Sequence, residues 1–250
     1  MDSVIALRKT GLEKGLSDER INFLERIMGS ESSGDNAAKN PNSTAVGLFQ
    51  FIEETWNRLV SKHPDELTKD GRKDPKQQRI AAIYFTQDNE EILTKALGRK
   101  PDDGELYLAH FLGTGGKNGE KGAIDIIREA EKNSSKPIKG FLPDIVLDKN
   151  KDVYLPLENG KKLFIKDFSV ADLHNWSAGK MGIPAKYETG INVRKDKNGI
   201  FDSQGNLVMV AIAVAVAVVA FVASGIGDIF SGDDPKPGSI PSKPRGHSRA

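Results

Sequence analysis

No charged side chain interrupts the run from Leu207 to Gly227, and nearly all of its residues are Val, Ala, Ile, Leu, Met or Phe. At about 1.5 Å per residue, a helix of this length crosses a hydrocarbon layer of roughly 30 Å. Ala and Val alternate between Val208 and Ala223, which also fits a strand. An isolated strand in lipid leaves its backbone amides unpaired, whereas a helix pairs them internally. We therefore expect one membrane-spanning helix at 207–227.

Small residues recur four positions apart in this apolar run, as in the pairs Ala211/Ala215 and Ala213/Ala217. Such spacing lets two membrane helices approach closely, so association into a homo-oligomer or with other membrane proteins is a hypothesis. Basic residues lie both before and after the run. The positive-inside rule therefore leaves the orientation open.

The two ends of the chain differ in character from this run. The stretch from Met1 to Gly15 carries Arg8, Lys9 and Lys14 but no continuous apolar core, so we expect no secretory signal. The stretch from Ser231 to Ala250 contains several prolines and many charges. Such a composition cannot bury enough apolar surface to order itself, and it predicts a disordered tail over 228–250.

The balance of charge and the missing cysteines exclude several classes of function. There are 36 basic and 35 acidic residues, for a net charge of +1, so nothing favours a nucleic-acid partner and none is expected. Without cysteine there is no disulfide, no thiolate zinc site and no cysteine nucleophile. The histidines show no metal-ligand spacing, and we expect neither a metal nor a cofactor; they are His63, His110, His174 and His247.

The first half of the chain is helical by its apolar spacing. Apolar residues recur every three or four positions between Ser17 and Ser30, which predicts an amphipathic helix that ends near Gly29, with Glu31 just beyond it. The stretch 33–44 is rich in Gly, Asn, Pro and Ser and predicts a loop. Further helices are expected at 53–60, 75–97, 103–112 and 119–132.

The composition changes after Asn133, where serines, prolines and glycines mark a boundary. Beyond it, Tyr154-Leu155 and Leu163-Phe164-Ile165 flank Asn159-Gly160, a dipeptide suited to a tight hairpin turn. We expect a small mixed connector whose role the sequence does not indicate. The predicted organisation is a helical domain, this connector, one membrane helix and a tail, at 1–135, 136–206, 207–227 and 228–250.

Three short elements in the helical half carry a family resemblance. They are Glu31-Ser32-Ser33-Gly34, then Ala45-Val46-Gly47-Leu48-Phe49-Gln50-Phe51 with Thr55-Trp56, and later Ala109-His110-Phe111-Leu112-Gly113. Their order and spacing resemble the soluble lytic transglycosylases, whose fold is that of goose-type lysozyme. In the third element His110 and Phe111 stand where that family has Tyr and Asn. The resemblance covers a little under half of the chain, from about residue 20 to 130.

The resemblance implies a mainly α, lysozyme-like catalytic domain that cleaves the glycan strands of peptidoglycan, with Glu31 as its single acid/base. Breaking a glycosidic bond requires a proton on a poor leaving oxygen while positive charge develops on the sugar ring. A carboxyl group beside apolar side chains stays protonated near neutral pH, because desolvation disfavours its charged form. In this family the N-acetyl group of the sugar supports the cation, and the primary hydroxyl of muramic acid closes an anhydro ring.

The other candidate site residues are polar groups of the same elements. We expect Ser32, Gln50, Tyr107 and His110 to bind the sugar or to position Glu31. Ser32 could instead cap its helix, and His110 could merely fill space. Tyr107 is the alternative for the family's missing Tyr, because residues three apart share a helix face.

Two further sets of residues near these elements have competing interpretations. Asp35 could be the second carboxylate of a hydrolase, but a loop Asp more often caps backbone amides, and we favour capping. The large apolar residues of the second element are expected in the core rather than in a sugar subsite; they are Leu48, Phe49, Phe51 and Trp56.

The expected substrate lies outside the cytoplasmic membrane, yet no export signal is expected. One hypothesis is a virion protein that opens the wall locally during genome entry, and the chain resembles the muralytic transglycosylases of phages with an internal membrane (tectivirus type). The alternative is a wall-remodelling component of a secretion or conjugation apparatus in the bacterial inner membrane. A non-catalytic glycan-binding membrane protein is the third reading, supported by the altered residues His110 and Phe111.

Overall fold

The computed structural model of this chain describes residues 3–41, 43–115, 121–157 and 160–189, and all of them belong to one compact unit. The predicted membrane helix at 207–227 and the predicted tail at 228–250 lie outside the described residues. Within the described ranges, no helix combines the length and the apolar character needed to cross a membrane.

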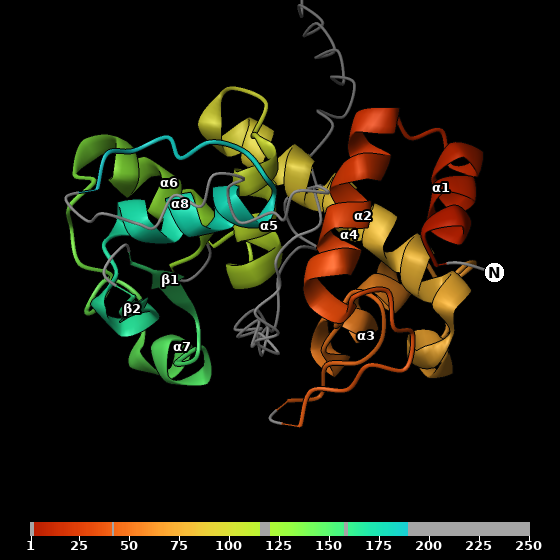
Figure 1. The fold of residues 1–250 in the computed structure, drawn as a ribbon. Coiled ribbons are helices and arrows are strands. Elements are labelled where there is room, and N and C mark those ends of the chain that lie inside the picture. The colour runs from red at the N-terminus through yellow and green to blue at the C-terminus, as the bar shows by residue number, and fades with distance from the viewer. Residues whose placement is uncertain (1–2, 42, 116–120, 158–159, 190–250) are drawn as a thin grey trace, which may run out of the picture. The chain divides into compact units, whose positions relative to one another are not determined.

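Helices dominate the part of the chain that the structure describes (Figure 1), which confirms the mainly α class. The helices are α1 (Ser3–Glu13), α2 (Asp18–Ser32), α3 (Glu53–Lys62), α4 (Pro75–Leu97), α5 (Asp103–Leu112), α6 (Ala123–Lys132), α7 (Asp144–Lys149) and α8 (Val170–Lys180). Two short 3-10 turns, η1 (Lys69–Lys73) and η2 (Ile165–Asp167), and two strands, β1 (Tyr154–Pro156) and β2 (Lys162–Phe164), complete the order.

Side-chain caps fix where the central helices begin and end. Asp74 accepts a hydrogen bond from the amide of Lys76 at the start of α4, and Gly98 ends that helix in the left-handed region at φ 70°. At the start of α5, Asp102 and Glu105 form a reciprocal capping box. These signals stand in the sequence, and the predicted ranges 75–97 and 103–112 agree with α4 and α5.

The predicted end of α2 near Gly29 was wrong. The helix continues to Ser32 and ends at Ser33, which adopts the left-handed conformation at φ 54° and donates its amide to the carbonyl of Gly29. Gly29 is tolerated inside the helix, where it costs only about 1 kcal/mol relative to alanine. Glu31 is therefore in the last turn of α2 rather than beyond it.

Three helices were not expected from the sequence: α1, α7 and α8. Helix α1 packs against α2 and α4 (Figure 1). Its Leu7 is fully buried, and a Cβ added to Gly11 would lie 2.7 Å from a side-chain carbon of Ile21, so glycine is what allows the close approach. The helix escaped prediction because few of its residues are strongly apolar on one face.

The predicted hairpin is present, with β1 and β2 paired antiparallel so that Leu155 lies opposite Leu163. It leads into α8, which lies beside α5 and α6 (Figure 1). The contact between α5 and α8 is tight, because a Cβ added to Gly104 would lie 2.8 Å from the Cα of Ala178. The domain boundary at residue 135 stays a prediction.

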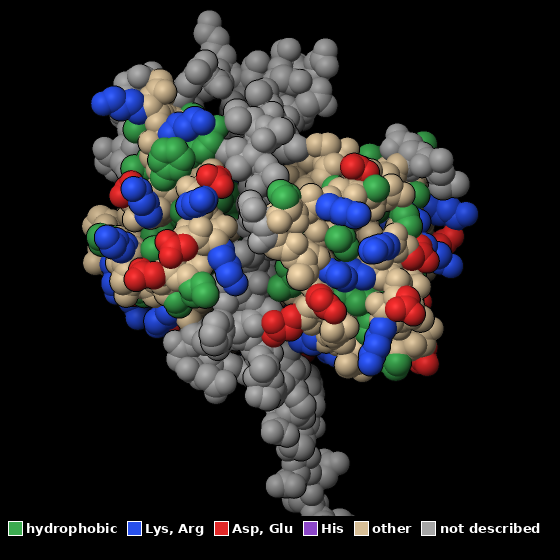
Figure 2. All heavy atoms as spheres, turned by 90° about the horizontal axis from the view of Figure 1, so that it is seen from below, with side chains coloured by type: hydrophobic (Ala, Val, Ile, Leu, Met, Phe, Trp, Pro, Cys, Tyr) green, Lys and Arg blue, Asp and Glu red, His purple; other side chains and the backbone are tan. Residues whose placement is uncertain are grey.

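One face of the described part of the chain mixes the two signs of charge. On the face drawn in Figure 2, Lys and Arg side chains are interspersed with Asp and Glu side chains. Interspersed charges give no extended field of one sign, which a polyanion would require. An uncharged sugar polymer places no such demand on a surface.

Candidate active site

Glu31 lies in the last turn of α2 with its carboxylate withdrawn from solvent, the side chain being only 1% exposed. The hydroxyl of Tyr107 donates a hydrogen bond to its Oε1 at 3.1 Å. Its Oε2 is also buried, and no described residue forms a hydrogen bond with it. The carboxyl group therefore has one fixed oxygen and one oxygen with unused hydrogen-bonding capacity.

Burial raises the pKa of Glu31 to about 7, because desolvation penalises the charged form. Two influences act in the opposite direction: the positive charge of Lys180 and the hydrogen bond from Tyr107. A carboxyl group with such a pKa is close to half protonated at neutral pH. It can therefore give up a proton or accept one under the same conditions.

Ser32 joins the end of α2 to the element at 45–51. Its hydroxyl donates to the carbonyl of Leu48 at 2.9 Å, lies 3.2 Å from the carbonyl of Met28, and accepts from the amide of Gly34 at 3.2 Å. Within the described ranges it makes no hydrogen bond to Glu31. In this structure Ser32 holds the loop against the helix end, and its contact with a sugar stays a prediction.

The element at 45–51 depends on two unusual backbone positions. Gly47 has φ 79°, and a Cβ there would lie 2.1 Å from the amide nitrogen of Gln78. The Oε1 of Gln78 in turn accepts the amide of Leu48 at 2.7 Å, so its side chain fills the space that glycine leaves. Gln50 also has a positive φ, at 49°. Glycine at position 47 is therefore favoured by its backbone angle and by the space that the Gln78 side chain occupies.

The side chain of Gln50 points into the protein and is 5% exposed. Its Nε2 donates to the carbonyls of Gly47 at 2.9 Å and Ala38 at 3.3 Å. The amide thus stabilises its own loop, and the sugar contact expected from the sequence stays a prediction. The apolar residues around it are buried, which confirms their expected core role: Leu48, Phe49, Phe51 and Trp56.

Tyr107 and His110 both face Glu31 from α5, but they do so differently. The Tyr107 hydroxyl bonds to Glu31 and lies 3.4 Å from the hydroxyl of Ser30; burial and the charge of Glu31 raise its pKa well above the ordinary value. The Nε2 of His110 is 3.9 Å from Oε1 of Glu31, too far for a hydrogen bond. Burial lowers the pKa of His110 to about 4, so the imidazole is neutral at pH 7. The imidazole ring of His110 packs edge-on against the aromatic ring of Phe85.

Replacing Tyr107 with Phe is expected to lower kcat about tenfold while the protein remains folded. The change removes the hydrogen bond that stabilises the carboxylate of Glu31, and such a bond to a charged group contributes about 1.5–3 kcal/mol. The measurement is the initial rate of glycan release from purified peptidoglycan. Tyr154→Phe, in the hairpin, is the control and should keep the parental rate; an unchanged rate in Tyr107→Phe contradicts the prediction.

Two residues of α8 also belong to this site, and the sequence analysis missed both. The ring of Trp176 lies 5.7 Å from the ring of Tyr107, and the ammonium of Lys180 lies 5.6 Å from the Trp176 ring. No local motif marks either residue, because both reach the site only through the packing of α8 on α5. The sequence signal that could have revealed α8 is the capping box formed by Ser169 and Asp172, which is typical of a helix start.

Asp35 does not act as a partner of Glu31 in the structure. It is exposed, and its Oδ1 accepts the amide of Ala37 at 2.8 Å. This confirms the expectation that Asp35 caps backbone amides in the loop.

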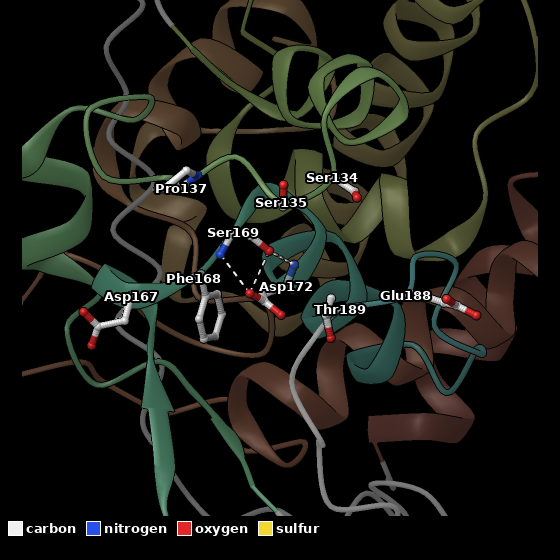
Figure 3. Close-up of a pocket in the computed structure, with 9 residues that line it drawn as sticks. All are labelled: Ser134, Ser135, Pro137, Asp167, Phe168, Ser169, Asp172, Glu188 and Thr189. Carbon is white, nitrogen blue, oxygen red and sulfur yellow. Dashed lines mark hydrogen bonds between the residues drawn. The ribbon is translucent and has the colours of Figure 1, made fainter.

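A hollow of about 290 Å³ lies elsewhere, where the start of α8 meets the segment after α6 (Figure 3). It is lined by none of the predicted site residues. Its central carboxylate, on Asp172, accepts hydrogen bonds from the amide and the hydroxyl of Ser169 at 2.8 and 2.7 Å. These bonds engage Oδ2 of Asp172 in capping the start of α8, while its Oδ1 is buried and accepts no hydrogen bond from the described residues.

One group of possible metal ligands lies between α5 and α8: one ligand atom from each of Asp102, Glu105 and His174, all within 4.8 Å of one another. Glu105 already accepts both Nη1 and Nη2 of Arg99 at 2.7 Å and the ammonium of Lys186 at 3.3 Å. Two cations therefore balance its charge. We interpret the group as an ion-pair network that joins the two helices.

Residues 16–115 match the family described as Transglycosylase SLT domain. This part of the chain is therefore similar to the soluble lytic transglycosylases, whose members are enzymes acting on peptidoglycan. The match runs from the residues before α2 to those after α5, so it includes Glu31, Tyr107 and His110. It does not include α6, α7 or α8, and Lys180 lies outside it.

Proposed function

We propose that this protein is a peptidoglycan lytic transglycosylase that cleaves the bond between N-acetylmuramic acid and N-acetylglucosamine and leaves an anhydro-muramic acid end. The observation that carries the proposal is the buried carboxyl group of Glu31, whose pKa of about 7 suits both an acid and a base. Its position inside the matched family segment supports the same role.

The reaction needs two proton transfers at one carboxyl group. Glu31 first gives its proton to the glycosidic oxygen, the bond from that oxygen to the muramic acid C1 breaks, and the N-acetyl group supports the cation. The resulting carboxylate then takes the proton of the primary hydroxyl, whose oxygen closes the ring at C1. The proton count returns to its starting value without consuming water.

A hydrolytic mechanism would require a second carboxylate about 5–9.5 Å from the first. Asp35, the loop carboxylate weighed for that role, is exposed and accepts a hydrogen bond from the amide of Ala37. This observation supports the transglycosylase mechanism over a lysozyme-type one.

Mass spectrometry of the fragments released from peptidoglycan tests the proposal. Anhydro ends are expected; reducing ends would indicate hydrolysis instead. Zymography of the full chain is run beside it, because a non-catalytic glycan-binding protein would clear no peptidoglycan at all. The altered third element, with His110 and Phe111, is the observation that favours that alternative.

We further propose a single-pass membrane location through residues 207–227, with the enzyme carried in a virion for local wall opening during genome entry. The uncharged run from Leu207 to Gly227 supports the anchor. Flotation of the full chain with lipid vesicles, compared with a chain ending at Asn206, tests it; equal flotation of the two counts against the anchor. A wall-remodelling protein of a secretion or conjugation apparatus is the alternative, and purified virions probed for the protein distinguish the two.

A further inference from the structure

Lys180, the last residue of α8, is a half-buried lysine without a conventional partner. Within the described ranges it forms no salt bridge of 4.0 Å or less, and its ammonium lies over the ring of Trp176 at 5.6 Å from the centroid. The acidic group that acts on it is Glu31. A lysine in such a position keeps its three N–H donors available.

Packing brings this lysine to the site from a distant part of the sequence. Trp176, one turn earlier on α8, packs against both Tyr107 and Phe111 of α5, with ring centroids 5.7 and 4.8 Å apart. Arg26 of α2 donates to the carbonyl of Met181 at 2.9 Å, directly after Lys180. The end of α8 is therefore fixed to both helices that carry Glu31 and Tyr107.

We propose that Lys180 is a positioning residue for proton transfer at Glu31, where its ammonium stabilises the carboxylate that remains once the proton has moved to the glycosidic oxygen. The inference rests on the proposed function, because it assigns a role within the same reaction. It also assigns part of the catalytic site to a helix outside the matched segment 16–115.

The other groups that face Glu31 do not supply this charge. Tyr107 is a neutral hydrogen-bond donor, because its pKa is raised. His110 is neutral, since burial lowers its pKa to about 4. The element at 45–51 contributes no ionisable side chain. Among the described residues, Lys180 is the cation that lowers the pKa of Glu31 against the effect of burial.

The role of Lys180 follows from when Glu31 becomes negatively charged during the reaction. Glu31 is neutral when it binds substrate as the acid and becomes negative as the glycosidic bond breaks. A fixed cation near the developing charge stabilises the transition state more than the ground state, which is the condition for acceleration. The same charge keeps the carboxylate from holding its proton too strongly.

The test compares Lys180→Met with Lys180→Arg in the full-length chain, using kcat and kcat/KM for peptidoglycan across pH. Lys180→Met is expected to lower the maximal kcat about tenfold. The pH above which kcat declines in Lys180→Met should be higher than in the parent, because the pKa of Glu31 rises when the cation is removed. Lys180→Arg retains the charge, so its kcat should decline at the same alkaline pH as that of the parent.

A matched control is Lys162→Met. Lys162 also lies over an aromatic ring, 4.0 Å from the centroid of Tyr154, but it is exposed in the hairpin and has no influence on the pKa of Glu31. It should show the parental rate and the parental pH profile. If Lys180→Met lowers kcat but the alkaline decline of kcat stays at the parental pH, Lys180 has a merely structural role and the proposal is overturned.

A direct titration separates this inference from the proposed function. Carbon-13 NMR of the labelled Glu31 carboxyl group follows its pKa without any turnover, with Lys180→Gln as a second variant should the Met variant not fold. A higher pKa in the variant supports the role of Lys180 even in an inactive protein, and an unchanged pKa overturns it. Activity retained by Glu31→Gln would overturn the proposed function, and the role of Lys180 in that reaction would fall with it, even if the titration still showed that Lys180 lowers the pKa of Glu31.

Discussion

Glu31→Gln is expected to reduce glycan cleavage by at least about a thousandfold while the protein still folds. General acid–base catalysis by one group typically contributes 10²–10⁴ in rate, and here the same group acts in both steps. An amide has nearly the shape of the carboxyl group but cannot donate a proton to the leaving oxygen. The rate of release of soluble fragments from purified peptidoglycan measures the effect.

The same variant is expected to be more stable than the parent above pH 7. Burial raises the pKa of Glu31 from 4.5 to about 7, so the native state binds this proton more tightly than the unfolded state. The parent therefore loses stability as pH rises from about 4.5 to about 7, by about 3 kcal/mol in all. Gln does not ionise, so the variant's urea unfolding should lack this loss.

Glu19→Gln is the matched control for both measurements. Glu19 lies on the same helix, but its side chain is 63% exposed and its ion pair with Lys100 is a surface one. It should keep the parental rate and a free energy of unfolding within about 0.5 kcal/mol of the parent. More than a tenth of the parental activity in Glu31→Gln would refute the acid/base assignment.

Local signals predicted the helices that carry the matched segment. Helix α4 is announced by Asp74-Pro75 at its start and by Gly98 at its end, and these residues act in the structure as such caps usually do. The hairpin was likewise predicted from two short apolar segments on either side of an Asn-Gly dipeptide. Such features depend on neighbours in the sequence, so the sequence alone is enough to find them.

The composition of the site depended on packing that no local pattern reveals. Tyr107 and His110 are three residues apart on one face of α5, so spacing could not tell which of them reaches Glu31. Which of the two forms a hydrogen bond with Glu31 depends on their positions along α5 relative to the end of α2. Lys180 comes from a helix far along the chain from Glu31, and only the contact of α8 with α5 brings it there.

That contact depends on one buried carboxylate, and Glu105→Gln is expected to destabilise the protein by about 2–4 kcal/mol. Glu105 is fully buried in α5. It accepts two hydrogen bonds from Arg99 and one from Lys186, lies 3.7 Å from the Nε2 of His174 on α8, and caps the amide of Asp102. The expected loss stays below that for a fully buried pair because the side chains of Arg99 and Lys186 are each 39% exposed.

The loss in Glu105→Gln should depend on pH in a defined direction. Burial acts to raise the pKa of Glu105, but the hydrogen bonds from Arg99 and the other contacts prevail and hold it well below the ordinary value of 4.5. The carboxylate therefore contributes stability above about pH 4.5, and that contribution is lost as pH falls below this value. The parent and the variant should differ most at neutral pH and converge in acid.

Thermal unfolding at pH 7 and pH 3 measures this effect, with a decrease in Tm of about 5–12 °C expected at pH 7. Glu131→Gln is the control, because Glu131 also pairs with Arg99, at 3.3 Å, but its side chain is 47% exposed. It should change Tm by no more than about 2 °C. An equal effect from both variants would mean that the buried network does not join α5 to α8. Since α5 carries Tyr107 and α8 carries Lys180, a real loosening in Glu105→Gln should also lower activity at temperatures where the parent remains fully active.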